Sequence, residues 1–202
     1  MTTSEEILDR IRSSRPSGDY PLPEIPRFAL RQTASLVDTF RGMLEAMGGQ
    51  FIVPGVDVDR FTELKARLAS AKVVCSATHE VQGNRDLASV AKPRDLADVD
   101  IAVVRAVLAV AETGSVLLTE TQLKVNTVAY LAQHLVVLLD PASIVPGLQD
   151  AYDSPEFHRA RYAVFHTGPS ATADIEGVLI HGAQGVRSLA VVLAAPGQLD
   201  LS

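Results

Sequence analysis

The sequence contains a single cysteine, Cys75. One cysteine excludes a disulfide within the chain, and it leaves the chain without the cysteine cluster that an iron–sulfur centre or a structural zinc site requires. Cys75 lies within the apolar run VVCSA. We therefore interpret it as a small core residue, because free cysteine is among the most buried residue types.

Blocks of positive charge and long apolar runs are also absent. The chain carries 18 Lys and Arg against 24 Asp and Glu, a formal net charge of −6, and no basic block is interleaved with aromatic residues. This composition argues against a nucleic-acid partner. No apolar run approaches the roughly 18 residues of a membrane span, and the polar start TTSEEILDR is unlike a signal peptide. We therefore expect no membrane span and a reducing, cytoplasmic setting.

The 202 residues, 47% of them hydrophobic, are enough for one α/β domain preceded by an N-terminal appendage. Residues 3–14 predict a short amphipathic helix, because their apolar residues recur at helical spacing. Residues 15–27 carry four prolines, which interrupt helices and sheets alike. We therefore expect an N-terminal helix and proline-rich arm over residues 1–29 and a single domain over residues 30–202. The arm either wraps a protein surface or is disordered.

Helical and extended patterns alternate after the arm. Amphipathic periodicity predicts helices at 30–47 and 59–69, and short apolar runs predict strands at 51–53 and 72–77. This alternation is typical of a mostly parallel α/β sheet covered by helices. The same criteria predict strands at 99–104, 116–118, 134–139, 162–167 and 188–195, and helices at 122–132 and 154–160.

One predicted strand is unusually apolar, and three other segments leave their secondary structure undecided. The strand at 134–139 is so apolar that we expect it to be central and buried on both faces. Residues 106–111 are small and apolar, and periodicity does not decide between helix and strand there. Residues 142–149 form a short helix or a turn, and the polar segment 78–98 predicts a short helix or a lid-like loop.

Turn residues follow the strand at 162–167. Gly168, Pro169 and Ser170 predict a tight loop, after which a helix is expected to begin near Thr172. Ser170 or Thr172 would cap that helix. Ligands of open α/β sheets bind at the carboxyl ends of strands, which is where this loop lies.

Two carboxylates, Asp174 and Glu176, fall in or near the first turn of that expected helix, where the helix dipole favours negative charge. One interpretation is a well-capped helix whose acids serve only the dipole. The other is a ligand site with Ser170, Thr172 and Asp174 at its rim. The acids argue against a phosphate at this position and fit a hydroxyl, an amine or another loop better.

A second polar segment interrupts the apolar run of residues 100–118. Glu112, Thr113, Gly114 and Ser115 form either an exposed turn with Gly114 at positive φ or a site loop. In a site loop, Glu112 would act as a general base, a nucleophile or a ligand. We expect this loop and the loop at Ser170 to meet at one end of the sheet.

His134 stands at the entry to the central strand, where a histidine is either a structural hydrogen-bonding group or a proton carrier. The candidate site therefore has Glu112 as its catalytic residue. Its ligand-binding residues are Thr113, Gly114, Ser115, His134, Gly168, Pro169, Ser170, Thr172, Asp174 and Glu176. We expect no bound metal, because Asp174, Glu176 and His181 would be spread along a helix.

Four segments together resemble the LUD domain family, and within it the lactate utilisation protein C group. They are GPSATADIE at 168–176, AETGS at 111–115, HLVV at 134–137 and HGAQGVRSLAVVL at 181–193. The resemblance covers roughly residues 35–193. It implies a three-layer, Rossmann-like open sheet of the ribose-5-phosphate isomerase and CoA-transferase type. It also implies a part in oxidising L-lactate to pyruvate within a system of three proteins.

The resemblance implies that this chain binds no cofactor and that iron–sulfur clusters lie on its partner proteins, the iron–sulfur lactate-utilisation proteins. A small organic acid is the ligand that fits this role. The sequence departs from the family pattern at Ala171, where an arginine is usual, around Asn126, where no arginine is present, and at Gln184, where a histidine is expected. Arginine binds carboxylates bidentately, and alanine cannot. Arg105, Lys124 and Arg187 are the candidates to substitute for the missing arginines.

Three functions are consistent with these patterns. The first is a non-redox component of a lactate-oxidising system. The second is an independent enzyme acting on a small carboxylate, an acyl-CoA or a sugar phosphate, since Glu112-Thr113-Gly114 weakly resembles the Glu-x-Gly of CoA-transferases. The third is a binding module without chemistry. A nicotinamide or flavin site is not supported, because no G-x-G-x-x-G follows a strand.

Overall fold

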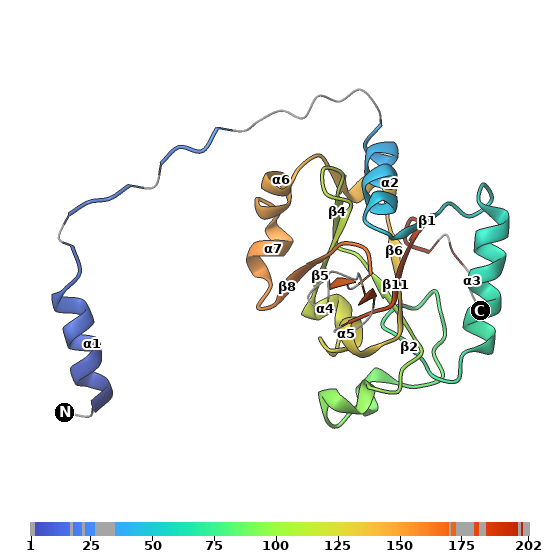
Figure 1. Cartoon of the computed structure of the whole chain (residues 1–202), viewed down its shortest axis with the longest axis horizontal. Helices are drawn as coiled ribbons and strands as arrows, with labels where there is room; N and C mark the ends of the chain where they lie inside the picture. The colour runs from blue at the N-terminus through green and yellow to red at the C-terminus, as the bar shows by residue number, and fades with distance from the viewer. Residues whose placement is uncertain are drawn as a thin grey trace.

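Five parallel strands form the main sheet of the computed structural model, in the order β1-β11-β6-β3-β2 (Figure 1). Their bounds are β1 (Gln50–Ile52), β2 (Val74–Ser76), β3 (Ile101–Arg105), β6 (His134–Leu139) and β11 (Ser188–Leu193). The predicted class, a mostly parallel Rossmann-like α/β sheet, is confirmed. The structure describes residues 3–16, 18–21, 23–26, 35–169, 171–172, 180–181, 185–197 and 199.

Strand β6 occupies the centre of this sheet, with β11 on one side and β3 on the other. Its residues from Leu135 to Leu139 are all buried. Alternate residues face alternate sides of a strand, so a strand covered on both faces needs apolar residues at every position. The uninterrupted apolar run is therefore the cause of the central position that the sequence predicted.

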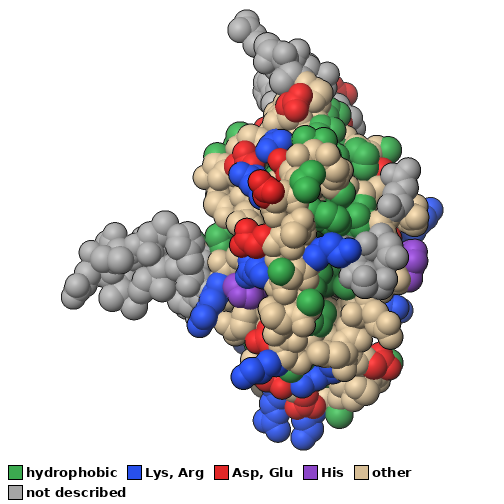
Figure 2. Space-filling view, turned by 90° about the vertical axis from the view of Figure 1, so that its right-hand side faces the viewer, with side chains coloured by type: hydrophobic (Ala, Val, Ile, Leu, Met, Phe, Trp, Pro, Cys, Tyr) green, Lys and Arg blue, Asp and Glu red, His purple; other side chains and the backbone are tan. Residues whose placement is uncertain are grey.

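Helices cover the two faces of the main sheet. Helix α3 (Val58–Ser70) packs Leu64 against one face, with Ile52, Val136 and other strand residues. Helix α2 (Leu36–Ala46) packs Phe40 and Leu44 on the opposite side, where the larger core cluster lies. On the face that carries α3, acidic and basic side chains are interspersed (Figure 2).

A second sheet of four strands, β7-β4-β5-β8, lies beyond the carboxyl end of β3, and the sequence patterns did not predict it. Its strands are β4 (Leu108–Val110), β5 (Ser115–Thr119), β7 (Ile144–Val145) and β8 (Ala163–His166). Ala109, Val116 and Leu118 join the main core, whereas Leu108, Val110 and Leu117 form a separate cluster. Both faces of β4 are therefore covered, which explains why residues 106–111 are apolar at every position.

Two short helices, α6 (Leu148–Tyr152) and α7 (Pro155–Arg159), follow β7 and contribute to that separate cluster. Ser154 caps α7 by accepting a hydrogen bond from the N–H of Phe157 at 3.2 Å, as the sequence predicted for this helix. Pro155 then occupies the first helical position, where its missing N–H is not needed.

The helix expected at 122–132 is in fact two short helices, α4 (Glu120–Leu123) and α5 (Val128–Leu131). The apolar spacing continues through both, so periodicity alone does not reveal the break. The helix expected to begin near Thr172 does not include Thr172 itself, and residues 173–179, where it would continue, lie outside the described residues. Ala171–Thr172 form strand β9, which pairs antiparallel with β10 (Ile180–His181). The backbone groups that a helix would pair internally are paired there with a neighbouring strand.

The segment between β2 and β3 carries two 3₁₀ turns, η1 (Leu87–Ser89) and η2 (Pro93–Leu96), and a third turn, η3 (Pro141–Ser143), follows β6. Leu87 and Leu96 are buried, so the segment packs onto the domain. Helix α1 (Thr3–Ser13) buries none of its residues and stands away from both sheets (Figure 1). Within the described ranges, no helix has the length and apolar character to cross a bilayer.

Candidate functional site

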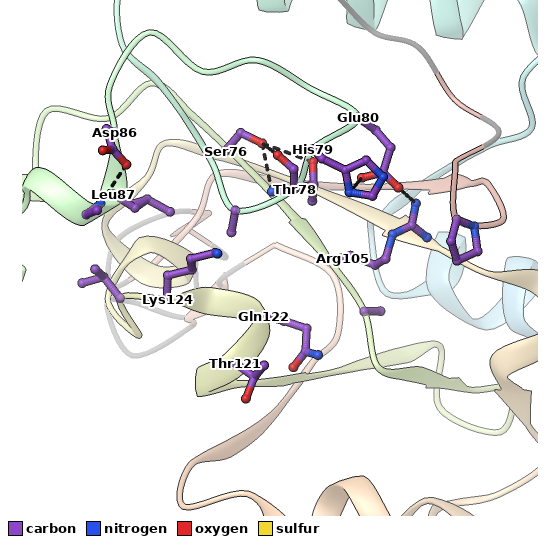
Figure 3. A pocket seen from close by; sticks show the side chains of 15 residues that line it. Ser76, Thr78, His79, Glu80, Asp86, Leu87, Arg105, Thr121, Gln122 and Lys124 are labelled. Carbon is purple, nitrogen blue, oxygen red and sulfur yellow. Dashed lines mark hydrogen bonds and ion pairs between the residues drawn. The ribbon is translucent and has the colours of Figure 1, made fainter.

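A cavity of about 730 Å³ lies at the carboxyl ends of β2 and β3 (Figure 3). One wall is formed by the strand ends and the loop after β2, with Ser76, Thr78, Glu80 and Arg105; the other is formed by α4, with Gln122 and Lys124. Its volume falls within the range of small-molecule sites, about 300–1,000 Å³. Its position follows the rule that open α/β sheets bind ligands at the carboxyl ends of their strands.

The charged centre of the cavity is the ion pair between Arg105 and Glu80. Arg105 Nη2 donates to Glu80 Oε1, and Arg105 Nη1 donates to the carbonyl oxygen of Ala194 at 2.9 Å. The side chain of Glu80 is 1% exposed and that of Arg105 is 20% exposed. Glu80 Oε2 and Arg105 Nε are both buried and have no hydrogen-bond partner in the described part of the chain. The pair therefore holds unused hydrogen-bonding capacity.

The ionisation of Glu80 depends on Arg105. Burial alone would raise the pKa of the Glu80 carboxyl, but the hydrogen bond from Arg105 and the charges of Arg105 and His79 outweigh it and lower the pKa. His79 Nδ1 lies 3.4 Å from Glu80 Oε2 and is itself largely exposed. Glu80 is therefore a buried anion that stays charged because of its cationic neighbour.

Lys124 stands at a strained point of the backbone, with φ 61° and ψ −50°. The N–H of Val125 donates to the carbonyl of Leu123 at 2.6 Å, which closes a γ-turn around Lys124. Among the described residues, Lys124 is the only non-glycine residue with positive φ. Such a conformation costs about 1–3 kcal/mol and is typical of functional sites. The turn ends α4 and points the ammonium group of Lys124 into the cavity (Figure 3).

Neutral hydrogen-bonding groups complete the cavity. The hydroxyl of Thr119 donates to Gln122 Oε1, which leaves the NH₂ group of Gln122 as a donor. The hydroxyl of Ser76 accepts from the N–H of Thr78 at 3.1 Å. The cations Arg105 and Lys124 stand beside two carboxylates, Glu80 and Asp86, and together with the amide donor and the hydroxyl groups these cations supply the donors that bind a small carboxylate or a similar anion.

One hydrogen bond joins the strand ends that border the two predicted loops. Strand β5 pairs with β8, which places Ser115 beside Thr167, and their hydroxyl groups bond to each other. Thr113 Oγ1 donates to Ser115 Oγ at 2.8 Å, which extends the chain of hydroxyls. The predicted residues Ser170, Asp174 and Glu176 lie outside the described residues, as does the side chain of Thr172.

Gly114 and Gly168 bring these loops against the carboxyl-terminal end of α2. Both have positive φ, 66° and 65°. A Cβ atom at Gly114 would overlap the backbone of Leu44, and one at Gly168 would overlap the carbonyl oxygen of Met47. Pro169 lies next to Gly48 in the same contact. The glycines are therefore required for packing, independently of any ligand.

Glu112 is exposed at the tip of the β4–β5 hairpin. Its Oε2 accepts from the N–H of Leu148 at 3.2 Å, and its own N–H donates to the carbonyl of Pro146 at 3.0 Å. These bonds join the hairpin tip to the start of α6. Glu112 does not line the Arg105 cavity, and its predicted catalytic role remains a prediction.

His134 lies at the start of β6, at the end of the sheet opposite the Arg105 cavity. Its Nδ1 bonds to Ser188 Oγ at 2.8 Å. Burial first, and then the charges of Arg67 and Arg187, lower the pKa of His134. Of the three cations proposed from the sequence as anion ligands, Arg105 and Lys124 line the cavity, whereas Arg187 lies near His134.

Glu80, Gln122, Ser76 and Thr78 were not predicted as site residues. The signal that could have found Ser76 and Thr78 is their place at the end of, and just after, the predicted strand at 72–77, which neighbours another parallel strand. Glu80 lies in a segment that reads as a polar loop, and its burial depends on its pairing with Arg105 across the fold. In the described ranges, no group of three His, Cys, Asp or Glu side chains is placed to hold a metal ion.

Comparison with known proteins identifies the family. The profile of the LUD domain matches residues 33–194. The structure is similar to the crystal structure of a DUF162 family protein from Deinococcus radiodurans, with a TM-score of 0.57 and 12% sequence identity over 79% of this chain and 96% of that chain. That likeness is one of fold, and no curated protein matches the sequence. Because the family profile spans nearly all of the sheet-forming region, this chain belongs to the LUD domain family, which is associated with lactate utilisation.

Proposed function

We propose that this protein is a non-redox component of a cytoplasmic system that oxidises L-lactate to pyruvate, and that its cavity binds the small carboxylate. The observation that carries the proposal is the convergence of Arg105 and Lys124 on one cavity at the carboxyl ends of β2 and β3. The family membership supplies the metabolic context.

The cavity chemistry suits a small organic acid. An arginine provides a planar set of donors for a carboxylate, and a lysine adds a mobile point charge. Gln122 and the hydroxyls of Ser76 and Thr78 could bond the 2-hydroxyl or 2-oxo group of such an acid. These cations come from positions other than the usual family arginine at Ala171, so the anion would be held from the β3 and α4 side.

Electron transfer is assigned to partner proteins in this proposal. The chain has one cysteine, which is buried, and burial raises the pKa of its thiol. An iron–sulfur cluster is held mainly by several cysteine thiolates, so clusters of the system would lie on iron–sulfur partners. The chain's own residues would bind and orient the acid rather than accept its electrons.

Titration calorimetry with L-lactate and pyruvate tests the binding part of the proposal. Lys124→Ala removes an exposed cation from the cavity and should weaken binding by about 10- to 100-fold, in line with a charge-assisted hydrogen bond of about 1.5–3 kcal/mol. Arg187→Ala is the matched control, because it removes an exposed cation from the other end of the sheet and should leave affinity unchanged. Absence of binding, or equal weakening by both variants, would contradict a carboxylate site in this cavity.

The partner part of the proposal has a separate test. The full chain should co-purify with iron–sulfur proteins from its own cells, and deletion of the protein should abolish growth on L-lactate as sole carbon source. Unchanged growth on lactate after deletion would sink the lactate-oxidation role while leaving the carboxylate site standing.

A further inference from the structure

In this structure, both terminal nitrogens of Arg105 already donate hydrogen bonds to other protein groups. Glu80 takes one face of the guanidinium through Nη2, and the carbonyl of Ala194 takes Nη1. Glu80 is almost completely shielded from solvent, while Arg105 is partly exposed toward the cavity. An incoming carboxylate therefore meets a neutral ion pair instead of a free cation.

Among the described residues that line the cavity, Arg105 is the only arginine. Arg105 faces Glu80 from the end of β3, and His79 faces it from the same loop that carries Glu80. Lys124 faces the cavity from α4, and Asp86 lies at its rim, where its carboxylate accepts from the N–H of Ala88 at 2.9 Å. A bound carboxylate would bring the local anions to three against the two cations Arg105 and Lys124.

Unused hydrogen-bonding capacity marks where the exchange would occur. Arg105 Nε is buried without a partner in the described part of the chain, and so is Glu80 Oε2. A carboxylate that bonds to Nε and Nη2 together would satisfy the orphaned donor, but it would place a second anion on the nitrogen that already binds Glu80 Oε1, and two carboxylates so close disfavour each other's charge. Leaving Glu80 buried, charged and unpaired would be strongly unfavourable.

We propose that a carboxylate ligand takes the place of Glu80 on Arg105, and that Glu80 takes up one proton from solvent as it is released. This inference rests on the proposed function. In the exchange, the Arg105–Glu80 ion pair breaks, the Arg105–ligand ion pair forms, and a new O–H bond forms on Glu80. Arg105 keeps its charge throughout. The neutral carboxyl group can then stay buried and can donate a hydrogen bond.

The causes of the present ionisation support this exchange. Burial is the largest influence on the pKa of Glu80 and acts to raise it, while the hydrogen bond and charge of Arg105 act to lower it. When the ligand draws Arg105 away, the lowering influence weakens and burial remains. The pKa of Glu80 therefore rises on binding, which links binding to proton uptake.

Titration calorimetry with pyruvate, in MES and in imidazole buffer, counts the protons taken up, because the two buffers differ in ionisation enthalpy and neither is a small anion of the kind that the site would bind. We expect about one proton per bound pyruvate at acidic to neutral pH, and an affinity that falls by up to about tenfold per pH unit as pH rises. Glu80→Gln imitates the protonated carboxyl. It should bind pyruvate more tightly, without proton uptake and with little dependence on pH.

His79→Gln is the matched control. It removes the imidazole next to Glu80 but keeps the Glu80–Arg105 pair, so proton uptake should persist. Uptake that disappears in His79→Gln would place the proton on His79 and overturn the assignment to Glu80. Circular dichroism checks that Glu80→Gln is folded; if it is not, the proton count in the wild type and in His79→Gln still decides.

The outcomes separate this inference from the proposed function. Pyruvate binding by the wild type without proton uptake would overturn the exchange and leave the carboxylate site intact. Binding by no variant, at any pH, would overturn both. Tighter, pH-independent binding by Glu80→Gln together with uptake by the wild type would establish Glu80 as the residue that competes with the substrate for Arg105.

Discussion

Ser115 on β5 and Thr167 after β8 bond to each other through their hydroxyl groups, and this bond joins the strand ends that border the two loops that the sequence singled out. Ser115 is buried and also accepts from Thr113. A buried hydroxyl that loses its partner costs about 1–3 kcal/mol. The pair is therefore a structural connection whether or not a ligand binds beside it.

Replacing either hydroxyl should destabilise the fold. Ser115→Ala and Thr167→Val should each lower the free energy of unfolding by about 1–2 kcal/mol, because Ser115→Ala removes the partner of both Thr113 and Thr167, and Thr167→Val leaves Ser115 with its bond from Thr113 alone. The double variant should cost less than the sum of the two. Urea unfolding of the four proteins measures this coupling, and strictly additive losses would show that the bond has no energetic weight.

Two substitutions of Lys124 separate the cost of backbone strain at this position from the contribution of its ammonium group to ligand binding. Lys124→Gly should unfold at higher urea concentration than Lys124→Ala, with a difference of about 1 kcal/mol, because glycine adopts positive φ without the Cβ penalty. Both variants should lose pyruvate affinity to the same extent, since both lack the ammonium group. Equal stability of the two variants would mean that the γ-turn at this position is not strained.

His166 should make stability depend on pH. Burial lowers the pKa of His166 to about 4, below the ordinary value of about 6.5. The unfolded chain therefore binds a proton at a higher pH than the folded one, so the stabilisation is full above about pH 6.5 and is lost as pH falls toward about 4. The loss should reach about 3 kcal/mol.

The measurement is urea unfolding at several pH values between these limits, compared with His166→Phe, which packs a ring of related shape and does not titrate. The variant should lack most of the dependence on pH. His166 Nε2 has no hydrogen-bond partner among the described residues, so the phenylalanine breaks no bond that the structure shows. A variant with the same pH profile as the wild type would contradict the buried, neutral imidazole.

Two substitutions of Glu112 distinguish a structural role of this residue from a catalytic one. Glu112→Gln keeps an acceptor oxygen for the N–H of Leu148 and should be nearly as stable as the wild type, while Glu112→Ala should lose about 1 kcal/mol. Thermal unfolding measures both. Intact-protein mass spectrometry after incubation with short acyl-CoAs adds a check. A covalent CoA adduct that disappears in Glu112→Gln would reveal the CoA-transferase chemistry for which the structural role gives no reason.

The parts of the fold that could be predicted are those whose physics is local or repetitive. The apolar run of β6 predicts a strand buried on both faces, and Ser154-Pro155 predicts a capped helix start. The break at Lys124 could not be predicted, because apolar spacing continues across it. The pairing of Ala171–Thr172 with Ile180–His181 was not predicted, because turn and capping residues are informative about one chain segment and not about a pairing partner.

The same limit applies to the site. Arg105 and Lys124 were foreseen as substitutes for missing arginines, because an anion needs cations and few others lie within the domain's apolar segments. Glu80 was not, since a carboxylate in a polar loop reads as solvated until the fold brings it to Arg105. His134 shows the reverse case: its position at a strand entry is visible in the sequence, and the rule that open α/β sheets bind ligands at the carboxyl ends of their strands already places a strand entry away from the cavity.

The contacts of helix α2 with two loops couple the positions of these three segments. Gly114 and Gly168 bring two loops from distant parts of the sequence into backbone contact with its carboxyl-terminal end, and Ser35, which caps its other end, is the first described residue after the proline-rich arm. Neither loop can shift without pushing on this helix. Helix α2 is therefore the element that both loops contact. A movement of either loop would displace the helix and, with it, the end that Ser35 caps.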